Sequence, residues 1–459
     1  MIGPVLIANR GEIACRIAST CRRLGVPTVA VFSDADADAM HVAAADRAER
    51  IGPPRPAESY LNIPAILDAA KRAGARAVHP GYGFLSENAD FAEACTAAGL
   101  VFIGPPASAI RAMGGKAAAK AVARRAGVPL LPGHEGEATD DQLEQAAARI
   151  GYPVMIKAVA GGGGRGMRRA EDAAGFPAAL AAARREAAAF GDSTVLLEKS
   201  IPQARHIEMQ VFADQHGNVI HLGERDCSPQ RRNQKLVEEA PAPGMDAALR
   251  AELGRRATAL AREVGYVGAG TVEFVADGSR PLGPDSIWFI EMNTRLQVEH
   301  PVTEMITGLD LVEWQLRIAA GEALPLRQEE VRLTGHAIEA RLCAEDPARN
   351  FLPSPGHIAA LDLPAPGEGL RVDAGVRAGD TLTPFYDPMI AKLIVHAPSR
   401  AAALARLAQA LDACRAEGIR LNSGFLAGLL RSPEMREGGV DTHFLETFRQ
   451  RGLAVPSPA

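Results

Sequence analysis

The six cysteines of this 459-residue chain form no CxxC pair, so the sequence lacks the spacing of a zinc ribbon and the pattern of a disulfide framework. No run of about 18 apolar residues occurs, which excludes an ordinary membrane-spanning helix. The first residues, MIGPVLIANRGE, lack a basic leader followed by a long apolar core. The sequence therefore predicts a protein that is neither secreted nor membrane-spanning, in a reducing cytoplasmic compartment.

The chain also lacks a strong charge of one sign. Its formal net charge is -5, which argues against a general nucleic-acid or membrane-surface binder. With 47% hydrophobic and 23% charged residues it has the composition of an ordinary globular protein, and its length predicts two to four domains.

The first 112 residues alternate apolar strands with amphipathic helices, a pattern typical of a parallel sheet in a Rossmann-like domain. The expected strands are residues 5–8, 28–32, 77–79 and 101–103, and the expected helices are residues 11–24, 63–73 and 91–98. Residues 9–12 and the segment HPGYGFLSEN (79–88) are loops at strand ends, where such sheets bind ligands. In the second loop Tyr82 and Glu87 are placed to face a cleft, although a purely structural role is equally open.

A glycine-rich stretch follows the predicted strand PVMIKA (153–158). The sequence GGGGRGM (161–167) leaves many backbone N–H groups unobstructed, so it can fold over a polyphosphate, with Lys157 and Arg165 adding positive charge. The same glycines satisfy a dinucleotide fingerprint, but that site requires a helix on the third glycine, whereas residues 167–170 read as a returning strand and the next helix is expected near Asp172. No Walker sequence is present, and a flexible linker is the remaining alternative. A glycine-rich hairpin over ATP fits best.

Several strands in the middle of the chain carry charged side chains. The strand LLEKS (196–200) is of a kind whose backbone can pair with an adenine edge, and residues 206–212 and 219–222 predict a hairpin. Residues 224–241 mix Arg225, Lys235 and other cations with acids, which indicates an anion site or, alternatively, a solvated loop. Glu273 interrupts an apolar strand at 270–276, and a metal ligand explains a carboxylate there best.

The densest polar segment is WFIEMNTRLQVEHPVTE (288–304). Alternate side chains of an extended segment share one face, so Glu291, Asn293, Arg295, Gln297 and Glu299 are expected to enter one cleft. Glutamate and asparagine oxygens suit Mg²⁺, arginine and glutamine suit a small planar anion, and Glu299 is then free to act as a base. The alternative is an edge strand with a solvated charged face.

Several long motifs of the chain resemble one family. KAVAGGGGRGM, RHIEMQVF, ERDCSPQRRNQK, FIEMNTRLQVEHPVTEM, HAIEARLCAEDP, FLPSPG and YDPMIAKL, preceded by IANRGEIA and HPGYGFLSEN, are similar to the biotin carboxylase component of biotin-dependent carboxylases over residues 1 to 447. The resemblance implies an α/β (α+β) ATP-grasp enzyme that makes carboxyphosphate from bicarbonate and MgATP. It then implies carboxylation of N1′ of biotin on a carrier domain, the first half-reaction of an acetyl-, propionyl- or methylcrotonyl-CoA type carboxylase.

The resemblance also implies roles for individual residues. The nucleotide would be held by Lys116, Lys157, Gly162, Gly163, Gly164, Gly166, Glu198, Lys199, Ile201, His206, Gln230 and Asn233. Magnesium or manganese would be held by Glu273, Glu291 and Asn293. Bicarbonate and biotin would be held by Lys235, Arg295, Gln297, Val298, Glu299, Arg341 and Tyr82, with Glu299 as the base and Arg341 stabilising the biotin enolate.

Two positions depart from the family pattern. Asn233 stands where most relatives carry His; asparagine also occurs in urea-type members, so the ribose contact and the final acceptor stay open. The connection DGSRPLGPD (277–285) is longer than in the shortest relatives. The expected domains are a Rossmann-like domain at 1–112, an ATP-grasp domain at 113–332 with a lid near 133–203, a C-terminal domain at 333–447 and a tail at 448–459.

No methionine is followed by lysine, the centre of a biotin attachment site, so the carrier is expected on another chain or domain. The resemblance implies a carboxyltransferase partner and a homodimer, and the chain is expected to be a free-standing subunit or the front of a longer polypeptide. The alternatives are a carbamoyl-phosphate or purine-pathway ATP-grasp ligase, which would lack the RLQVEH arrangement, and a non-catalytic nucleotide-binding regulator.

Overall fold

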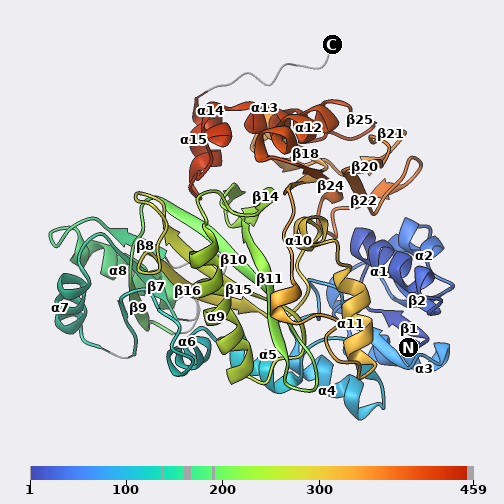
Figure 1. Ribbon diagram of the computed structural model, residues 1–459, viewed down its shortest axis with the longest axis horizontal. Helices are drawn as coiled ribbons and strands as arrows, with labels where there is room; N and C mark the ends of the chain where they lie inside the picture. The colour runs from blue at the N-terminus through green and yellow to red at the C-terminus, as the bar shows by residue number, and fades with distance from the viewer. Residues whose placement is uncertain (1, 137, 160–166, 189–191, 452–459) are drawn as a thin grey trace.

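The computed structural model describes residues 2–136, 138–159, 167–188 and 192–451 (Figure 1). The N-terminal domain and a small helical and stranded subdomain lie at opposite ends of the molecule, with a large sheet between them and the last helices along its top in this view. No helix in these described ranges is long and apolar enough to cross a membrane.

The N-terminal domain contains the predicted parallel sheet, in the order β3-β2-β1-β4-β5. The strands are β1 (Val5–Ile7), β2 (Thr28–Ser33), β3 (Arg47–Gly52), β4 (Ala77–His79) and β5 (Val101–Phe102), and the helices are α1 (Gly11–Arg23), α2 (Met40–Ala44), α3 (Ile63–Ala73) and α4 (Ala89–Ala97). The sequence did not predict β3, because three of the first four residues of this edge strand are charged and none of those four is buried. The short helix α2 was not predicted either, whereas the four predicted strands and three predicted helices are confirmed.

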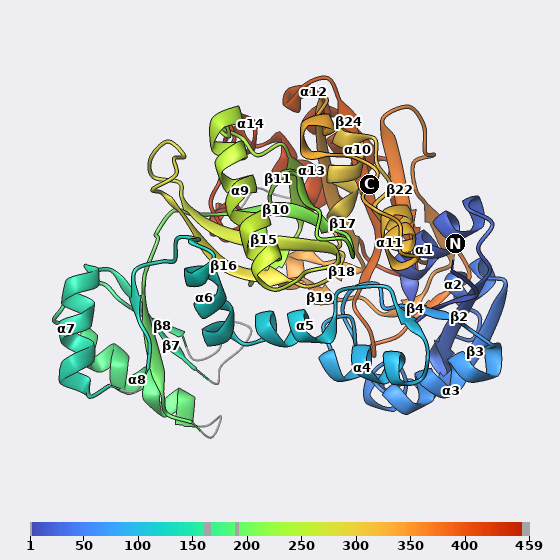
Figure 2. The same ribbon diagram turned by 60° about the horizontal axis from the view of Figure 1, so that its bottom comes forward.

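Helices α5 (Ala107–Gly114) and α6 (Lys116–Arg125) lead to a separate small sheet of order β6-β9-β7-β8. It contains β6 (Gly133–His134), β7 (Val154–Ala158), β8 (Met167–Ala170) and β9 (Val195–Lys199), and helices α7 (Asp140–Ile150) and α8 (Phe176–Ala188) cover it. We call residues 133–203 the lid. It has its own hydrophobic core and stands apart from the body of the molecule (Figure 2). The returning strand β8 is confirmed, while α8 begins at Phe176, after a turn in which Gly175 donates to Asp172.

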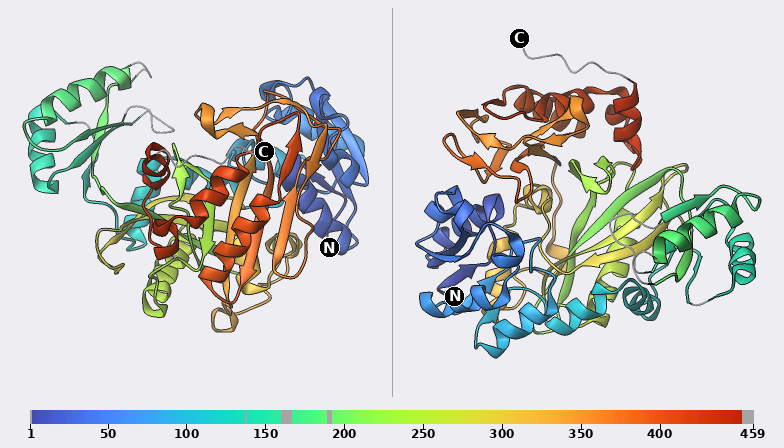
Figure 3. Two further views of the ribbon diagram at one scale, coloured as in Figure 1. Left: turned by 90° about the horizontal axis from the view of Figure 1, so that it is seen from above. Right: turned by 180° about the vertical axis from the view of Figure 1, so that it is seen from behind.

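The body is one eight-stranded sheet of order β16-β15-β10-β11-β14-β17-β24-β22, and each pair of neighbours runs antiparallel. Its strands are β10 (Ala204–Ala213), β11 (Val219–Asp226), β14 (Val237–Ala240), β15 (Gly268–Asp277), β16 (Ile287–Asn293), β17 (His336–Cys343), β22 (Leu370–Ala374) and β24 (Met389–Ala397). Strands from residues 204–293 and from residues 336–397 therefore share one continuous sheet, which two further views show (Figure 3).

Helices and short strands complete the body. The helices are α9 (Ala247–Glu263), α10 (His300–Thr307), α11 (Leu311–Ala319), α12 (Arg400–Asp412), α13 (Ser423–Arg431), α14 (Pro433–Glu437) and α15 (Phe444–Gln450). The short strands are β12 (Gln230–Arg231), β13 (Gln234–Lys235), β18 (Glu345–Asp346), β19 (Leu352–Pro353), β20 (Gly356–His357), β21 (Ala360–Asp362), β23 (Thr381–Leu382) and β25 (Arg415–Glu417).

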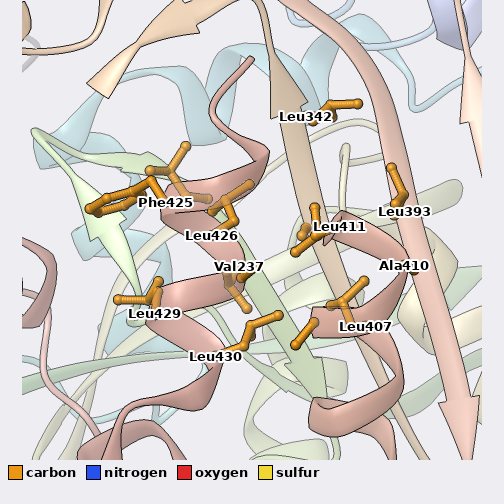
Figure 4. Packing of buried hydrophobic residues seen from close by; sticks show 14 of the residues in the cluster. Val237, Leu342, Leu393, Leu407, Ala410, Leu411, Phe425, Leu426, Leu429 and Leu430 are labelled. Carbon is orange, nitrogen blue, oxygen red and sulfur yellow. The ribbon is translucent and has the colours of Figure 1, made fainter. Parts of the chain in front are cut away.

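The largest hydrophobic core lies where α12 and α13 cover β17 and β24. Leu342, Leu393, Leu407, Leu411 and Leu426 are fully buried between these layers (Figure 4). Helix α12 ends at Asp412, and the chain then continues into β25, which pairs with β21. This core fixes the strands that carry Arg341 and Lys392.

Candidate active site

Three adjacent strands of the body sheet align glutamates on one face. Glu208 on β10 pairs with Glu273 on β15, and Glu273 pairs with Glu291 on β16. Directly opposed residues of antiparallel strands have Cβ atoms about 4.5–5.5 Å apart, so the three carboxylates form a row. His206 lies on the same face as Glu208, with Nε2 3.0 Å from a Glu273 oxygen.

A β-bulge places Glu291 in this row. Phe274 pairs with Phe289 and Glu273 pairs with Glu291, so Ile290 is an extra residue and is exposed. Without the bulge, alternation from the buried Phe289 would turn Glu291 toward the core. The expectation of an extended segment through Glu299 was wrong, because β16 ends at Asn293 and Glu299 caps the start of α10. The side chains of Asn293, Gln297 and Glu299 nevertheless approach one centre.

Lys235 is that centre. Its Nζ donates to Glu208 (2.6 Å), Glu273 (2.9 Å) and Glu299 (2.6 Å). The β12–β13 hairpin presents it through a two-residue turn in which Arg232 and Asn233 have φ of 49° and 66°. Asparagine tolerates this left-handed conformation better than most residues. The backbone conformation of the turn therefore explains an asparagine at position 233 without any contact to a ribose.

Arg225 is a buried cation beside the row of carboxylates. The guanidinium is fully buried, and its Nε donates to Glu208 at 2.5 Å. Its remaining donors reach Gln210, Thr271, Gln297 and Thr303. The interpretation of residues 224–241 as a solvated loop is therefore excluded, since most of the segment is buried. Arg225 acts as an internal counter-ion.

Glu299 lies between two cations. One carboxylate oxygen accepts from Lys235, and the other accepts from Arg341 Nη2 at 2.9 Å. Burial alone would raise the pKa of Glu299, but Lys235, Arg341 and Arg225 outweigh it and hold the pKa well below its ordinary value. Arg341 also donates from Nε to Glu238 at 2.6 Å. Glu299 is thus a carboxylate that stays ionised over the whole physiological pH range.

The remaining anion-binding candidates surround this pair. Arg295 donates to Glu87 (2.9 Å) and to the Asn293 oxygen (3.0 Å), so the loop at 79–88 reaches the site. Gln297 donates to Glu273 at 2.9 Å. The Val298 carbonyl accepts from Lys392, which is fully buried. Tyr82 is linked to the site through Lys392, which its ring faces, and its hydroxyl donates to Glu12.

Several of the nucleotide-binding candidates lie on the lid sheet and on α6. Lys157 on β7 and Lys120 on α6 both contact Glu198 on β9, and Lys199 donates to the carbonyls of Gly151 and Tyr152. Lys116 is exposed at the start of α6, Ile201 is half-buried after β9, and Gln230 is buried on β12 beside the Cys227 carbonyl. Gly162, Gly163, Gly164 and Gly166 lie outside the described residues.

The predicted metal ligands have the chemistry that Mg²⁺ or Mn²⁺ requires. Burial raises the pKa of Glu291, and the nearby charge of Glu273 raises it further. A divalent cation between two such carboxylates would remove their repulsion. The amide oxygen of Asn293, which accepts from Arg295 here while the amide nitrogen donates to Glu273, would be a third hard ligand once that amide turns toward the cation. Glu273 stays strongly ionised, because Lys235 and His206 overcome the effect of burial on its pKa. The residues therefore fit the metal.

Sequence reasoning missed several members of the site. Glu208 shares the alternating face of His206 in HIEMQVF, and this periodicity was sufficient to find it. Glu12, Glu238 and Lys392 come from distant segments, and only the fold brings them near Arg341 and Glu299. Lys120 gave no signal beyond its place on a helix.

A Rossmann-like domain, a separate lid sheet and a body sheet lined with acids and cations define an ATP-grasp protein. Residues 1–110 match the family model "Biotin carboxylase, N-terminal domain". Residues 115–327 match "Carbamoyl-phosphate synthase L chain, ATP binding domain", and residues 339–447 match "Biotin carboxylase C-terminal domain". The chain belongs to the biotin carboxylase family.

Relatives agree with this placement. The biotin carboxylase of Halalkalibacterium halodurans is 52% identical over 97% of both chains. The alpha subunit of the mitochondrial methylcrotonoyl-CoA carboxylase of Oryza sativa subsp. japonica is 56% identical over 99% of this chain, but the match covers 62% of that subunit. The chain thus spans about three fifths of the length of such subunits.

Solved structures share the fold. The biotin carboxylase of Campylobacter jejuni in complex with beta-gamma-ATP has a TM-score of 0.90 and 46% identity, covering 97% of this chain and 99% of that one. The biotin carboxylase domain dimer of the Hydrogenobacter thermophilus 2-oxoglutarate carboxylase, in complex with MgADP, ADP and bicarbonate, has the same TM-score and identity, covering 100% and 99%.

Proposed function

We propose that this chain is the biotin carboxylase component of a biotin-dependent carboxylase. It uses ATP and bicarbonate to form carboxyphosphate and then carboxylates N1′ of biotin presented by a carrier domain. The observation that carries the proposal is the convergence of Lys235, Glu299 and Arg341 beside Glu273, Glu291 and Asn293. This arrangement places two cations for a small anion, a candidate base and a pair of candidate metal-binding carboxylates next to one another.

Glu299 takes the proton from bicarbonate. In the present structure its two cations hold it as a weak base, but an anion bound to Lys235 and Arg341 shares their charge and raises the basicity of Glu299. Arg295 and Gln297 orient the anion, and the Val298 backbone lies beside it. Carboxyphosphate then releases phosphate, which takes the N1′ proton of biotin, and Arg341 faces the negative charge that develops on the biotin ring.

Glu273, Glu291 and Asn293 would hold Mg²⁺ or Mn²⁺, which neutralises charge on the transferring phosphoryl group. Lys116, Lys157 and His206 bind the phosphates, Glu198, Lys199 and Ile201 border the base, and Gln230 and Asn233 border the ribose. The glycine-rich loop covers the phosphates and excludes water from the labile acyl phosphate.

The assembly belongs to the same proposal. The carrier and the carboxyltransferase are other domains or subunits, in keeping with relatives that are carboxylase alpha chains. A homodimer is supported by the dimer of the Hydrogenobacter thermophilus domain. The divisions at 112, 332 and 447 are supported by the ranges of the three family matches. A cytoplasmic location stays a prediction, and the final acceptor stays open between the acyl-CoA types and urea.

The test measures carboxylation directly. Purified chain, MgATP and labelled bicarbonate are incubated with a biotinylated carrier or with free biotin. We expect transfer of label to the carrier to be much faster than to free biotin, because a tethered carrier presents biotin already oriented to the cleft. Bicarbonate-independent ADP release with no labelled biotin would contradict the proposal.

A further inference from the structure

Behind Arg341 lies a pair of buried acids that the proposed reaction does not use. Glu238 on β14 and Glu339 on β17 are directly opposed in the antiparallel register, and both side chains are fully buried. Opposed residues of neighbouring strands share one face, with Cβ atoms about 4.5–5.5 Å apart, so the two side chains are neighbours, and the charge of Glu238 acts on Glu339.

The hydrogen bonding of this pair is incomplete if both acids are ionised. One Glu238 oxygen accepts from Arg341 Nε at 2.6 Å, while its other oxygen and both oxygens of Glu339 are buried without a hydrogen-bond partner. Unpaired buried carboxylate oxygens are costly, and two adjacent carboxylates repel each other. A single proton between them satisfies an oxygen on each side and removes the repulsion.

The surrounding charges favour that proton on Glu339. The groups that face the pair are Lys235 from β13, Glu299 from the start of α10, Arg341 from β17, Lys392 from β24 and Glu12 from α1. Burial raises the pKa of Glu339 well above its ordinary value, and Lys392 only partly opposes this, because Lys392 also faces Glu12 and Asp373. Burial likewise raises the pKa of Glu238, to about 7, against the opposing charge of Arg341.

We propose that Glu238 and Glu339 share one proton across the β14–β17 pair and act as positioning residues that hold Arg341 against Glu299. Glu339 donates to the free oxygen of Glu238, and Glu238 keeps the negative charge that orients the guanidinium. Since Arg341 bonds both Glu238 and Glu299, the pair sets the geometry of the cation that faces bicarbonate and biotin. This role of Arg341 rests on the proposed function, whereas the shared proton does not.

The shared proton is tested by stability against pH. A carboxyl group with a raised pKa in the folded state lowers stability as pH rises from its unfolded pKa, about 4.3, toward its folded pKa. Glu339→Gln imitates the protonated form and removes this loss. We expect the urea midpoint of Glu339→Gln, relative to the unsubstituted protein, to rise between pH 5 and pH 8.

Glu239→Gln is the matched control. Glu239 is the next residue on β14 and bonds His336 and Arg400, away from the proposed site. Burial opposes its ionisation, but His336 and Arg400 hold its pKa below the ordinary value. Its substitution should therefore lower the midpoint at pH 7, and the difference should shrink as pH falls through the folded pKa. A relative midpoint of Glu339→Gln that is flat or falls with rising pH would overturn the shared proton.

The positioning role is tested by kinetics. Glu238→Gln removes the charge that orients Arg341, and Glu238→Asp keeps the charge but withdraws it by one methylene, which guards against a variant that fails to fold. We expect carrier carboxylation to fall about 10²-fold in both, with nucleotide affinity by calorimetry unchanged. Because the pKa of Glu238 is raised to about 7, we expect turnover of the unsubstituted protein to change near neutral pH. Glu238→Gln should lose this change, and Glu239→Gln should keep it. Normal turnover in both variants would overturn the positioning role even if the midpoint results hold.

Discussion

At the scale of single residues, the site is a set of buried charges that compensate one another. Lys235 contacts three carboxylates, and Arg225 supports one of them from inside the sheet. Desolvation makes each of these groups costly alone, so the cluster is stable only as a whole. This dependence separates residues that fold the site from residues that react in it.

Arg225→Met tests the internal counter-ion. The substitution leaves Glu208 buried with Lys235 and the more distant His206 to compensate it, and it removes the donors to Gln210 and Gln297. We expect a loss of about 3–5 kcal/mol in the free energy of unfolding, measured by urea denaturation. Arg255→Met, which removes a largely exposed arginine of α9, should leave the midpoint unchanged. Equal effects of the two substitutions would show that Arg225 is not a structural counter-ion.

At the scale of secondary structure, the core of α12, α13, β17 and β24 holds Arg341 in place. Leu411→Ala removes a fully buried side chain of this core, whereas Leu352→Ala removes one that is 50% exposed. We expect the first to cost about 2–5 kcal/mol of unfolding free energy and the second to cost little. Urea denaturation measures both, and a small effect of Leu411→Ala would show that the core is not tightly packed.

The elements that the sequence predicted well are those with a regular apolar period. Residues 63–73 and 77–79 were predicted to the residue, and the β7–β8 hairpin was recognised from the absence of a helix after the glycines. The edge strand β3 was missed because its exposed face carries charges. The cleft face of residues 291–299 was predicted, but the start of α10 was not, and neither was the bulge at Ile290, which depends on pairing with β15.

The residues of the site also divide into those that the sequence predicted and those that it did not. Residues within one segment, such as Glu291, Asn293 and Glu299, were found by their spacing. The pairing of Glu238 with Glu339 joins residues about a hundred positions apart, and no local pattern specifies it. Tertiary register, rather than composition, decides which acids meet.

At the scale of the whole molecule, the lid is joined to the body by few segments and has a core of its own. We expect it to close on MgATP as one unit, with increased hydrogen-exchange protection in Met167–Ala170. Strand β1 of the N-terminal domain is an internal control whose protection should stay unchanged. Identical exchange of the lid with and without MgATP would contradict closure.

The N-terminal and C-terminal domains also meet at a contact that contains charged side chains. Arg10 bonds Asp36 and lies 4.1 Å from the centre of the Tyr386 ring, and Tyr60 donates to Asp36 at 2.6 Å. Burial opposes the ionisation of Asp36, but Arg10 and Tyr60 lower its pKa below the ordinary value. The resulting stabilisation is fully present above the unfolded pKa, about 3.9, and is lost as pH falls through the folded pKa.

Asp36→Asn should therefore cost about 1.5–3 kcal/mol of unfolding free energy at pH 7. The cost should shrink as pH falls below 4, because the unsubstituted protein loses the same charge there. Thermal or urea unfolding at a series of pH values measures it, and a cost that is constant from pH 7 to pH 3 would refute the role of the ionised carboxylate.

The central claim is that Glu299 deprotonates bicarbonate while Lys235 holds the anion. Steady-state ADP release is measured as bicarbonate is varied, beside nucleotide binding by calorimetry, for Glu299→Gln and Lys235→Gln. Glu299→Gln keeps the shape of the side chain but removes the base, so ATP should still bind while bicarbonate-dependent turnover falls about 10²–10⁴-fold. Lys235→Gln should also raise the bicarbonate concentration needed for half-maximal rate. Near-normal bicarbonate-dependent turnover in Glu299→Gln would contradict the account and leave this site as a cradle for metal and anion alone.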